Sequence, residues 1–200
     1  MPIHFPEPPE DVLRVAGLDH HGELGGMSGA NLDDIAATER VVPLPPQPVF
    51  TAGLDAMSTL DEPRKAMGGQ PNWRVTRWDE TGQAAAIEVL GEPSADPVLS
   101  SGDDRFSDEI RAALRIATRD DRVAHRPYEA RLLRVPGLSL LALWLHAREH
   151  PDLFVPFQAV GDARPRQLYE RDEFIGFLRD AANRQLEAFS EAERPDELGS

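Results

Sequence analysis

The stretch His146-Ala147-Arg148-Glu149-His150 carries the residue types that most directly suggest chemistry. On a helix, His146 and His150 would share one face and could bind a zinc ion. Glu149 could then act as the general base that activates a zinc-bound water. This spacing raises the hypothesis of a small metal-dependent hydrolase whose site is built from His146, Glu149 and His150.

The same five residues resemble the H-x-x-E-H signature of the inverted zincins. The resemblance implies a third ligand, a glutamate further along the chain, and the available candidates are Glu170, Glu173 and Glu187. Two features oppose this interpretation. Pro151 follows His150 directly and disfavours helix there, and a strand over the preceding residues would remove the i, i+4 geometry. We therefore expect a solvated strand or helix end, and we assign no catalytic, cofactor-binding or metal-binding residue.

A second triplet, Asp19-His20-His21, resembles the metal-binding Asp-His-His of the DHH phosphoesterases. It lies in a glycine-rich segment of low hydrophobicity, without the further aspartate motifs of that family, so we expect a loop. Gly22–Gly29 is rich in glycine but follows no predicted strand and lacks the lysine of a phosphate-binding loop. Ser100-Ser101-Gly102 has the composition of a loop, and no nucleophile motif is present. The sequence thus predicts no cofactor.

The elements that would have to position these residues centre on residues 127–160, where large apolar side chains are nearly continuous. Such a run belongs in the middle of a fold, covered on both sides. We predict strands over Tyr128–Val135 and Asp152–Val160. Leu138–His146 is apolar on both faces, so periodicity leaves strand and helix open; the tight Pro136-Gly137 link favours a strand.

Two more strands and two helices flank this region. Trp73–Asp79 and Ala84–Leu90 predict a hairpin, and Gly91–Asp104 predicts a loop. Ser107 is a candidate N-cap for a helix to about Arg119, and Asp172 opens a longer helix to about Ala192. The order ββαβββα predicts an α+β fold, a mostly antiparallel sheet with two helices packed on one face.

Residues 1–66 differ in composition from the rest, since they hold nine of the eighteen prolines and eleven acids against four bases. Their apolar residues are too sparse to offset the entropy of ordering the segment. We predict an acidic, proline-rich extended arm that is not an independent domain, with plain disorder as the alternative. Within it, Val41–Phe50 should be extended or polyproline II, and a short helix could begin at Asn31. The core domain is then 67–192, followed by a frayed tail at 193–200.

Charge and composition limit the functional classes. The net charge of −14 argues against nucleic acid and suits a protein partner with a basic surface. The chain has no cysteine, and its N-terminus lacks the features of a secretory signal. The apolar run 138–145 is too short to span a membrane.

We therefore expect a soluble, cytoplasmic protein, and twenty arginines against one lysine suggest a bacterial source with a GC-rich genome. The favoured function is a non-catalytic protein-binding component: an assembly, adaptor, chaperone or immunity-type protein. The metal-dependent hydrolase and a small-molecule-binding domain with a pocket between sheet and helices remain alternatives. A homo-oligomer is compatible with the sequence.

Overall fold

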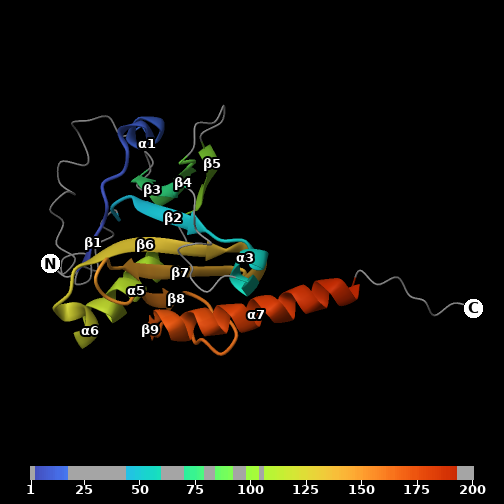
Figure 1. The fold of residues 1–200 in the computed structure, drawn as a ribbon. Helices are drawn as coiled ribbons and strands as arrows, with labels where there is room; N and C mark the ends of the chain where they lie inside the picture. The colour runs from blue at the N-terminus through green and yellow to red at the C-terminus, as the bar shows by residue number, and fades with distance from the viewer. Residues whose placement is uncertain are drawn as a thin grey trace, which may run out of the picture.

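The computed structural model describes residues 3–17, 44–59, 70–78, 84–91, 98–103 and 106–192. Within these ranges the chain forms a mixed α+β fold around one mostly antiparallel sheet (Figure 1). The strands lie in the order β5-β4-β3-β2-β6-β7-β8-β9, and β1 pairs with β6 beside β2. The α+β class expected from the sequence is confirmed.

The centre of the sheet is formed by β6 (Tyr128–Val135), β7 (Leu140–His146) and β8 (Leu153–Pro156), paired antiparallel. Leu143 lies opposite Leu132 on β6 and opposite Val155 on β8. The strand interpretation of the apolar run is therefore confirmed. This strand begins two residues later than expected, because Pro136–Leu138 form a 3₁₀ turn, η2, and Ser139 has a left-handed φ of 51°.

Helices cover both faces of this centre. On one face, α5 (Ser107–Thr118) and α6 (Asp121–Ala124) pack through Ile110, Leu114 and Val123 against a cluster that contains Leu132 and Leu143. On the other face, α7 (Arg171–Ala192) and α3 (Leu54–Thr59) belong to a cluster that contains Leu133 and Trp144.

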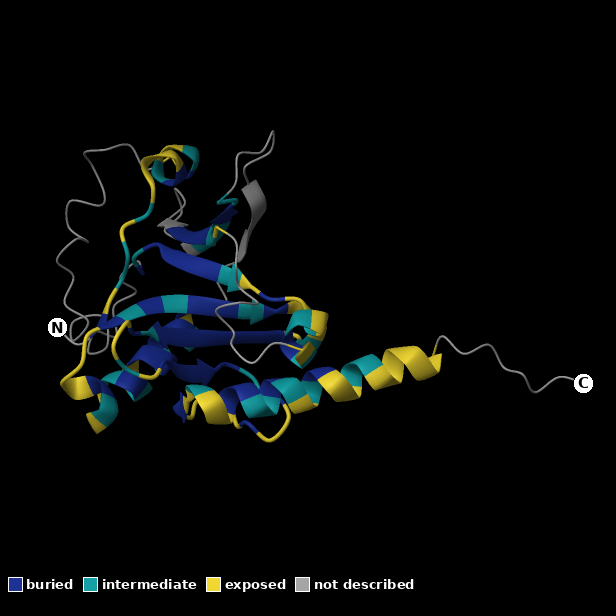
Figure 2. Ribbon diagram, in the orientation of Figure 1, coloured by how far each residue is buried: buried dark blue, intermediate teal, exposed yellow. Residues whose placement is uncertain are grey.

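The prediction that both long helices lie on one face is wrong. Adjacent residues of a strand point to opposite faces, and the neighbours Leu132 and Leu133 are both buried. Each face of the central strands therefore needs its own cover, and α5 and α7 supply one each. Figure 2 shows the resulting buried centre and the exposed far end of α7.

The first 66 residues contribute directly to the sheet, where the sequence predicted an extended arm. Besides α3, they supply β1 (Ile3–His4), α1 (Glu10–Val15) and β2 (Gln47–Thr51). The expected extended conformation near Phe50 takes the form of β2, which lies between β3 (Asn72–Trp78) and β6. Because β2 is an inner strand, the sheet does not begin at residue 67.

Smaller differences concern the edges of elements. Residues 98–103 were predicted as loop but form β5 (Val98–Asp103), which pairs with β4 (Ala84–Val89). Pairing with β4, rather than the composition of the segment, specifies this strand. Ser107 is the first residue of α5, and Phe106 precedes it as N-cap. Tyr169–Glu170 form a short strand, β9, against β8. Several predicted features lie outside the described residues: the Asn31 helix, the turn of the predicted hairpin, the Asp19 triplet, the Gly22–Gly29 segment and the 193–200 tail.

Among the described helices, none combines the length and the apolar character that crossing a membrane requires.

Candidate functional site

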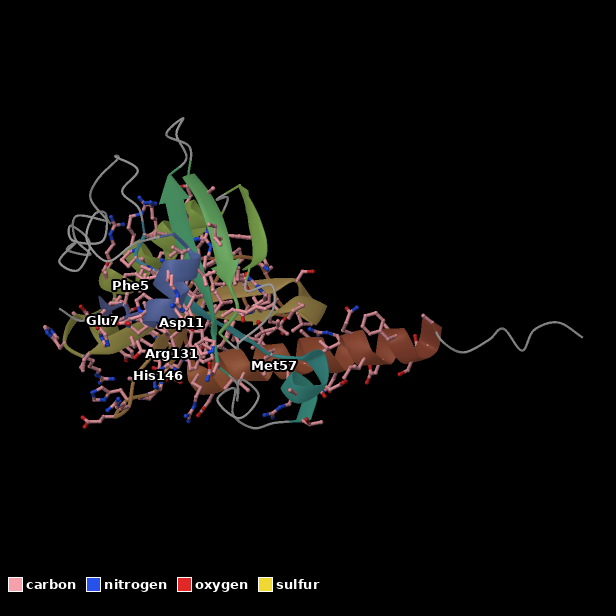
Figure 3. The ribbon with its side chains drawn as sticks, turned by 90° about the horizontal axis from the view of Figure 1, so that it is seen from above. Phe5, Glu7, Asp11, Met57, Arg131 and His146 are labelled. Atoms are coloured by element: carbon pink, nitrogen blue, oxygen red, sulfur yellow. The ribbon has the colours of Figure 1, made fainter. Side chains whose placement is uncertain are left out.

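A pocket of about 380 Å³ opens where β1, the start of β6 and the bend after β7 meet. Glu129 of β6 pairs in register with His146 of β7, and Arg131 pairs with Trp144, so these four side chains share one face of the sheet. Figure 3 labels Arg131 and His146, two of the residues that line this pocket. The pocket is lined by His4, Pro127, Glu129, Arg131, His146, Ala147, Arg148, Glu149 and His150.

The three residues of the predicted hydrolase motif all line this pocket, but they are not on a helix. His146 is the last residue of β7, whereas Glu149 and His150 lie in the bend that follows. The spacing that would place two histidines on one helical face is therefore absent, as Pro151 and the apolar strand indicated. No group of three metal-binding side chains is assembled within the described ranges. The three candidate third ligands, Glu170, Glu173 and Glu187, do not line the pocket.

The orientation of His146 is fixed by a buried carboxylate. Asp152 is only 2% exposed, and its Oδ1 lies 3.1 Å from His146 Nδ1. The same Oδ1 accepts the backbone N–H of Ala147 at 3.0 Å. When the imidazole is neutral, this contact places its proton on Nδ1. Asp152 thus holds both the ring and the first residue of the bend in place.

Arg131 is held in a defined orientation by contacts on three sides. Its Nε donates to Glu129 Oε1 at 2.6 Å. Its guanidinium carbon lies 5.0 Å from the ring centre of Phe50 and 4.8 Å from that of Trp144, distances typical of cation–π contacts. The side chain is 19% exposed. A guanidinium fixed in this way is organised before any ligand arrives.

A second polar cluster lies on the opposite face of the sheet, on β3, β4 and β6. Arg134 donates to both carboxylate oxygens of Glu88, at 2.7 and 2.6 Å, and Asn72 Nδ2 donates to the same carboxylate at 3.1 Å. Arg74 is 4% exposed and donates to Thr76 Oγ1. Burial lowers the pKa of Arg74 to about 10, against the opposing influence of Glu88, so Arg74 stays charged at neutral pH.

Gln47 of β2 lies beside this cluster, paired in register with Arg74. It is 1% exposed, and among the described residues neither its side-chain oxygen nor its side-chain nitrogen has a hydrogen-bond partner. A buried amide without partners destabilises the fold. This cluster is built as structure, because its charged groups bond to one another and to neighbouring polar side chains.

Several other residues of types that could carry chemistry have structural places. Trp73 and Trp144 are buried, and the side chain of Trp78 is outside the described part. Asp120 is the N-cap of α6, and its hydrogen bonds from Arg122 lower the pKa of its carboxyl. Ser100-Ser101-Gly102 lies in β5 rather than in a loop.

Sequence reasoning did not identify His4, Glu129 or Arg131 as site residues. Glu129 and Arg131 lie two residues apart on β6 and therefore share one face, but only the register against β7 brings them to His146. The pairing of β1 with β6 brings His4 to the same pocket.

No family model matches this chain, and no curated protein or solved structure is similar enough to match it.

Proposed function

We propose that this chain is a non-catalytic protein-binding component of a bacterial cytoplasmic system, of the assembly, adaptor, chaperone or immunity type. Its partner carries a basic surface, and the projecting end of α7 inserts into an apolar groove on that surface. The observation that carries the proposal is an apolar stripe on α7 that continues past the body of the protein.

The first half of α7 has an intramolecular role. Phe174, Ile175, Leu178 and Ala182 are buried, and Phe174 stacks on Phe154 of β8 with ring centres 4.9 Å apart. After Ala182, no residue of α7 up to Ala192 is buried. The helix spans 22 residues, about 33 Å, and its last turns extend beyond the sheet (Figures 1 and 2).

The apolar stripe continues along this projecting part. With 3.6 residues per turn, Leu186 and Phe189 lie on the same side of the helix as Leu178 and Ala182. Phe189 is 51% exposed, more than any other large apolar residue that the structure describes. A helix end without tertiary packing is marginal in water, so a partner that covers Leu186 and Phe189 would stabilise it.

The charge of the chain favours a basic partner over a second copy of itself. Two chains of net charge −14 repel each other. A partner with a basic surface is instead attracted by this negative charge, which speeds association and favours that partner over acidic proteins. Glu187 and Glu191, on the outer side of the projecting helix, add to this negative field.

We do not extend the proposal to metal-dependent hydrolysis. The hypothesis required His146 and His150 on one helical face, and these residues lie at the end of a strand and in a bend.

The test is site-specific photo-crosslinking in the native host, with a photoreactive phenylalanine derivative in place of Phe189. The control places the same derivative at Asn183, which is exposed and lies about a third of a turn around the helix from Phe189. The proposal expects one identified protein with a basic surface to crosslink at position 189 and not at 183. Crosslinks only to a second copy of the chain, or the same products at both positions, would contradict it.

The identified partner is then titrated, as purified protein, against variants of the full chain. Phe189→Asp should raise Kd at least about tenfold, since truncating a central aromatic contact typically costs about 2 kcal/mol or more. Asn183→Asp adds a similar charge at the control position and should leave Kd nearly unchanged. An unchanged Kd for Phe189→Asp would remove α7 from the interface.

A further inference from the structure

We infer that the pocket between β1, β6 and the bend after β7 binds a small carboxylate-bearing molecule, with Arg131 as its principal contact. The inference is independent of the proposed protein partner, because the pocket and the projecting end of α7 use different residues.

The first observation is the unused hydrogen-bonding capacity of Arg131. Its Nε donates to Glu129, and its guanidinium is held against the rings of Phe50 and Trp144. Its two terminal nitrogens have no acceptor among the described residues. A fixed, planar pair of N–H donors is the geometry that recognises a carboxylate through two parallel hydrogen bonds.

The second observation is the composition of the walls. Three of the six histidines in the chain, His4, His146 and His150, line this one pocket together with a second arginine, Arg148. Guanidinium groups donate hydrogen bonds to oxygen ligands, and so does the N–H of a neutral imidazole. Neutral His146 keeps its proton on Nδ1 toward Asp152, so the wall donors besides Arg131 are Arg148, His4 and His150. Acidic residues predominate in the chain as a whole, which has a net charge of −14. This pocket differs because hydrogen-bond donors gather in it.

The charge balance of the pocket favours a monoanion over a dianion. The formal charges of Arg131 and Arg148 are cancelled by those of Glu129 and Glu149 when the imidazoles are neutral. A carboxylate can pair with the terminal nitrogens of Arg131 while Glu129 keeps its hold on Nε. A phosphate dianion would bring twice the negative charge against the same glutamates, so it fits less well.

The size and the remaining walls limit the rest of the ligand. A volume of about 380 Å³ is at the lower end of the range for small-molecule sites. Pro127 and Ala147 give the pocket an apolar part. A carboxylate on a short apolar or aromatic body therefore matches the site.

The test uses benzoate as the probe, with benzamide as its uncharged counterpart and inorganic phosphate as the competing anion class. Amide chemical shifts of the purified full chain are followed by NMR during each titration. We expect saturable shifts with benzoate at residues 129–131 and 146–150, and much weaker binding of benzamide and phosphate. Equal or tighter binding of phosphate would overturn the carboxylate assignment, and no saturable shifts with benzoate would overturn the site.

Variants locate the contact. Arg131→Lys keeps the charge but loses the planar donor pair, and should raise Kd for benzoate about tenfold, equivalent to about 1.4 kcal/mol. Arg148→Gln, at an exposed position where folding is undisturbed, should raise Kd by a smaller factor. Arg119→Gln, exposed at the end of α5, is the matched control and should change nothing.

Thermal unfolding of each variant separates binding from stability. If Arg131→Lys does not fold, the shift map and Arg148→Gln still decide the question. Binding that is unaffected by Arg148→Gln and maps outside residues 129–150 would contradict the assignment.

Discussion

Strands β7 and β8, with Leu132 and Leu133 of β6, lie between apolar side chains on both faces. On β2, β3 and β4, by contrast, one face is polar: it carries Gln47, Arg74 and Glu88, and Arg134 of β6 joins it. We call the first group the apolar half of the sheet and the second the polar half. In the apolar half, Leu132 and Leu133 face α5 and α7 in turn. In the polar half, Trp73, Val75 and Val89 pack under α1 on one face. Arg74 and Glu88 occupy the other face.

The two halves of the sheet are stabilised by different interactions. The apolar half is stabilised by area removed from water, at roughly 25 cal/mol per Å². The polar half depends on charges that must stay paired, because a buried charge without a partner is strongly destabilising. Substitutions should therefore change the free energy of unfolding differently in the two halves. In the apolar half the loss should grow with the side-chain volume removed, whereas in the polar half it should depend on which charged partners remain.

The largest effect is expected where the two halves are joined. A chain truncated to residues 67–200 lacks β1 and β2, and with them the buried side chains of Ile3, Leu44 and Val49. Each such side chain contributes roughly 1.5–3 kcal/mol, and their sum is comparable with a total stability of about 5–15 kcal/mol. We expect no cooperative thermal unfolding by circular dichroism. A sharp transition close to that of the intact chain would show that 67–192 folds as a unit without β2.

Within the apolar half, Phe174→Ala should lower the free energy of unfolding by about 3–5 kcal/mol. Phe174 is fully buried and stacks on Phe154 and Tyr169. Urea unfolding followed by tryptophan fluorescence measures the change. Glu173→Ala, at the exposed neighbouring position, should change stability by less than about 0.5 kcal/mol. Equal effects at the two positions would mean that α7 does not cover this face.

The two halves also differ in how far the sequence predicted them. The continuous apolar run located the three central strands, and β6 has the predicted limits. The Pro136-Gly137 link, rather than the run itself, favoured a strand for β7, and β8 (Leu153–Pro156) is shorter than the predicted 152–160. The helix predicted after Ser107 is α5, and its apolar residues at helical spacing, Ile110, Ala113, Leu114 and Ala117, are all buried. These signals are local, since each comes from the periodicity of one segment.

The polar half and the pocket depend on partners far apart in the sequence. β2 carries Pro48 within a proline-rich segment, and its strand conformation is specified by pairing with β3 and β6. Arg134 finds Glu88 across 46 residues, and a charge on a strand does not reveal its partner. For the same reason, His146 was recognised only as part of a local motif, whereas its contact with Asp152 and its proximity to Arg131 follow from the fold.

An intermediate effect is expected from removing a charge in the polar half. Glu88→Gln keeps the side-chain shape but leaves Arg134 and Arg74 without their carboxylate, which should cost about 1–3 kcal/mol. The cost is below that of a fully buried pair because Arg134 is partly exposed. The double variant Glu88→Gln/Arg134→Gln should recover part of the loss in urea unfolding. A double variant less stable than the sum of both single changes would argue against this pairing.

The smallest effect, and the one of opposite sign, is expected at Gln47. Its amide is buried beside Arg74 with no hydrogen-bond partner among the described residues. An unsatisfied buried amide costs about 1–3 kcal/mol, whereas a thioether of similar length loses no hydrogen bond on burial. Gln47→Met should therefore raise the free energy of unfolding by about 1 kcal/mol, measured by urea denaturation.

Gln70→Met, at an exposed position just before β3, is the matched control and should be neutral. The sign of the Gln47 effect tests the division of the sheet directly. A gain in stability would mean that the face of β2 beside Arg74 prefers an apolar side chain, so that the polar cluster is confined to Arg74, Glu88 and Arg134 with their direct partners. A loss of more than about 1 kcal/mol would mean that the Gln47 amide interacts with Arg74, and the polar cluster would then include β2.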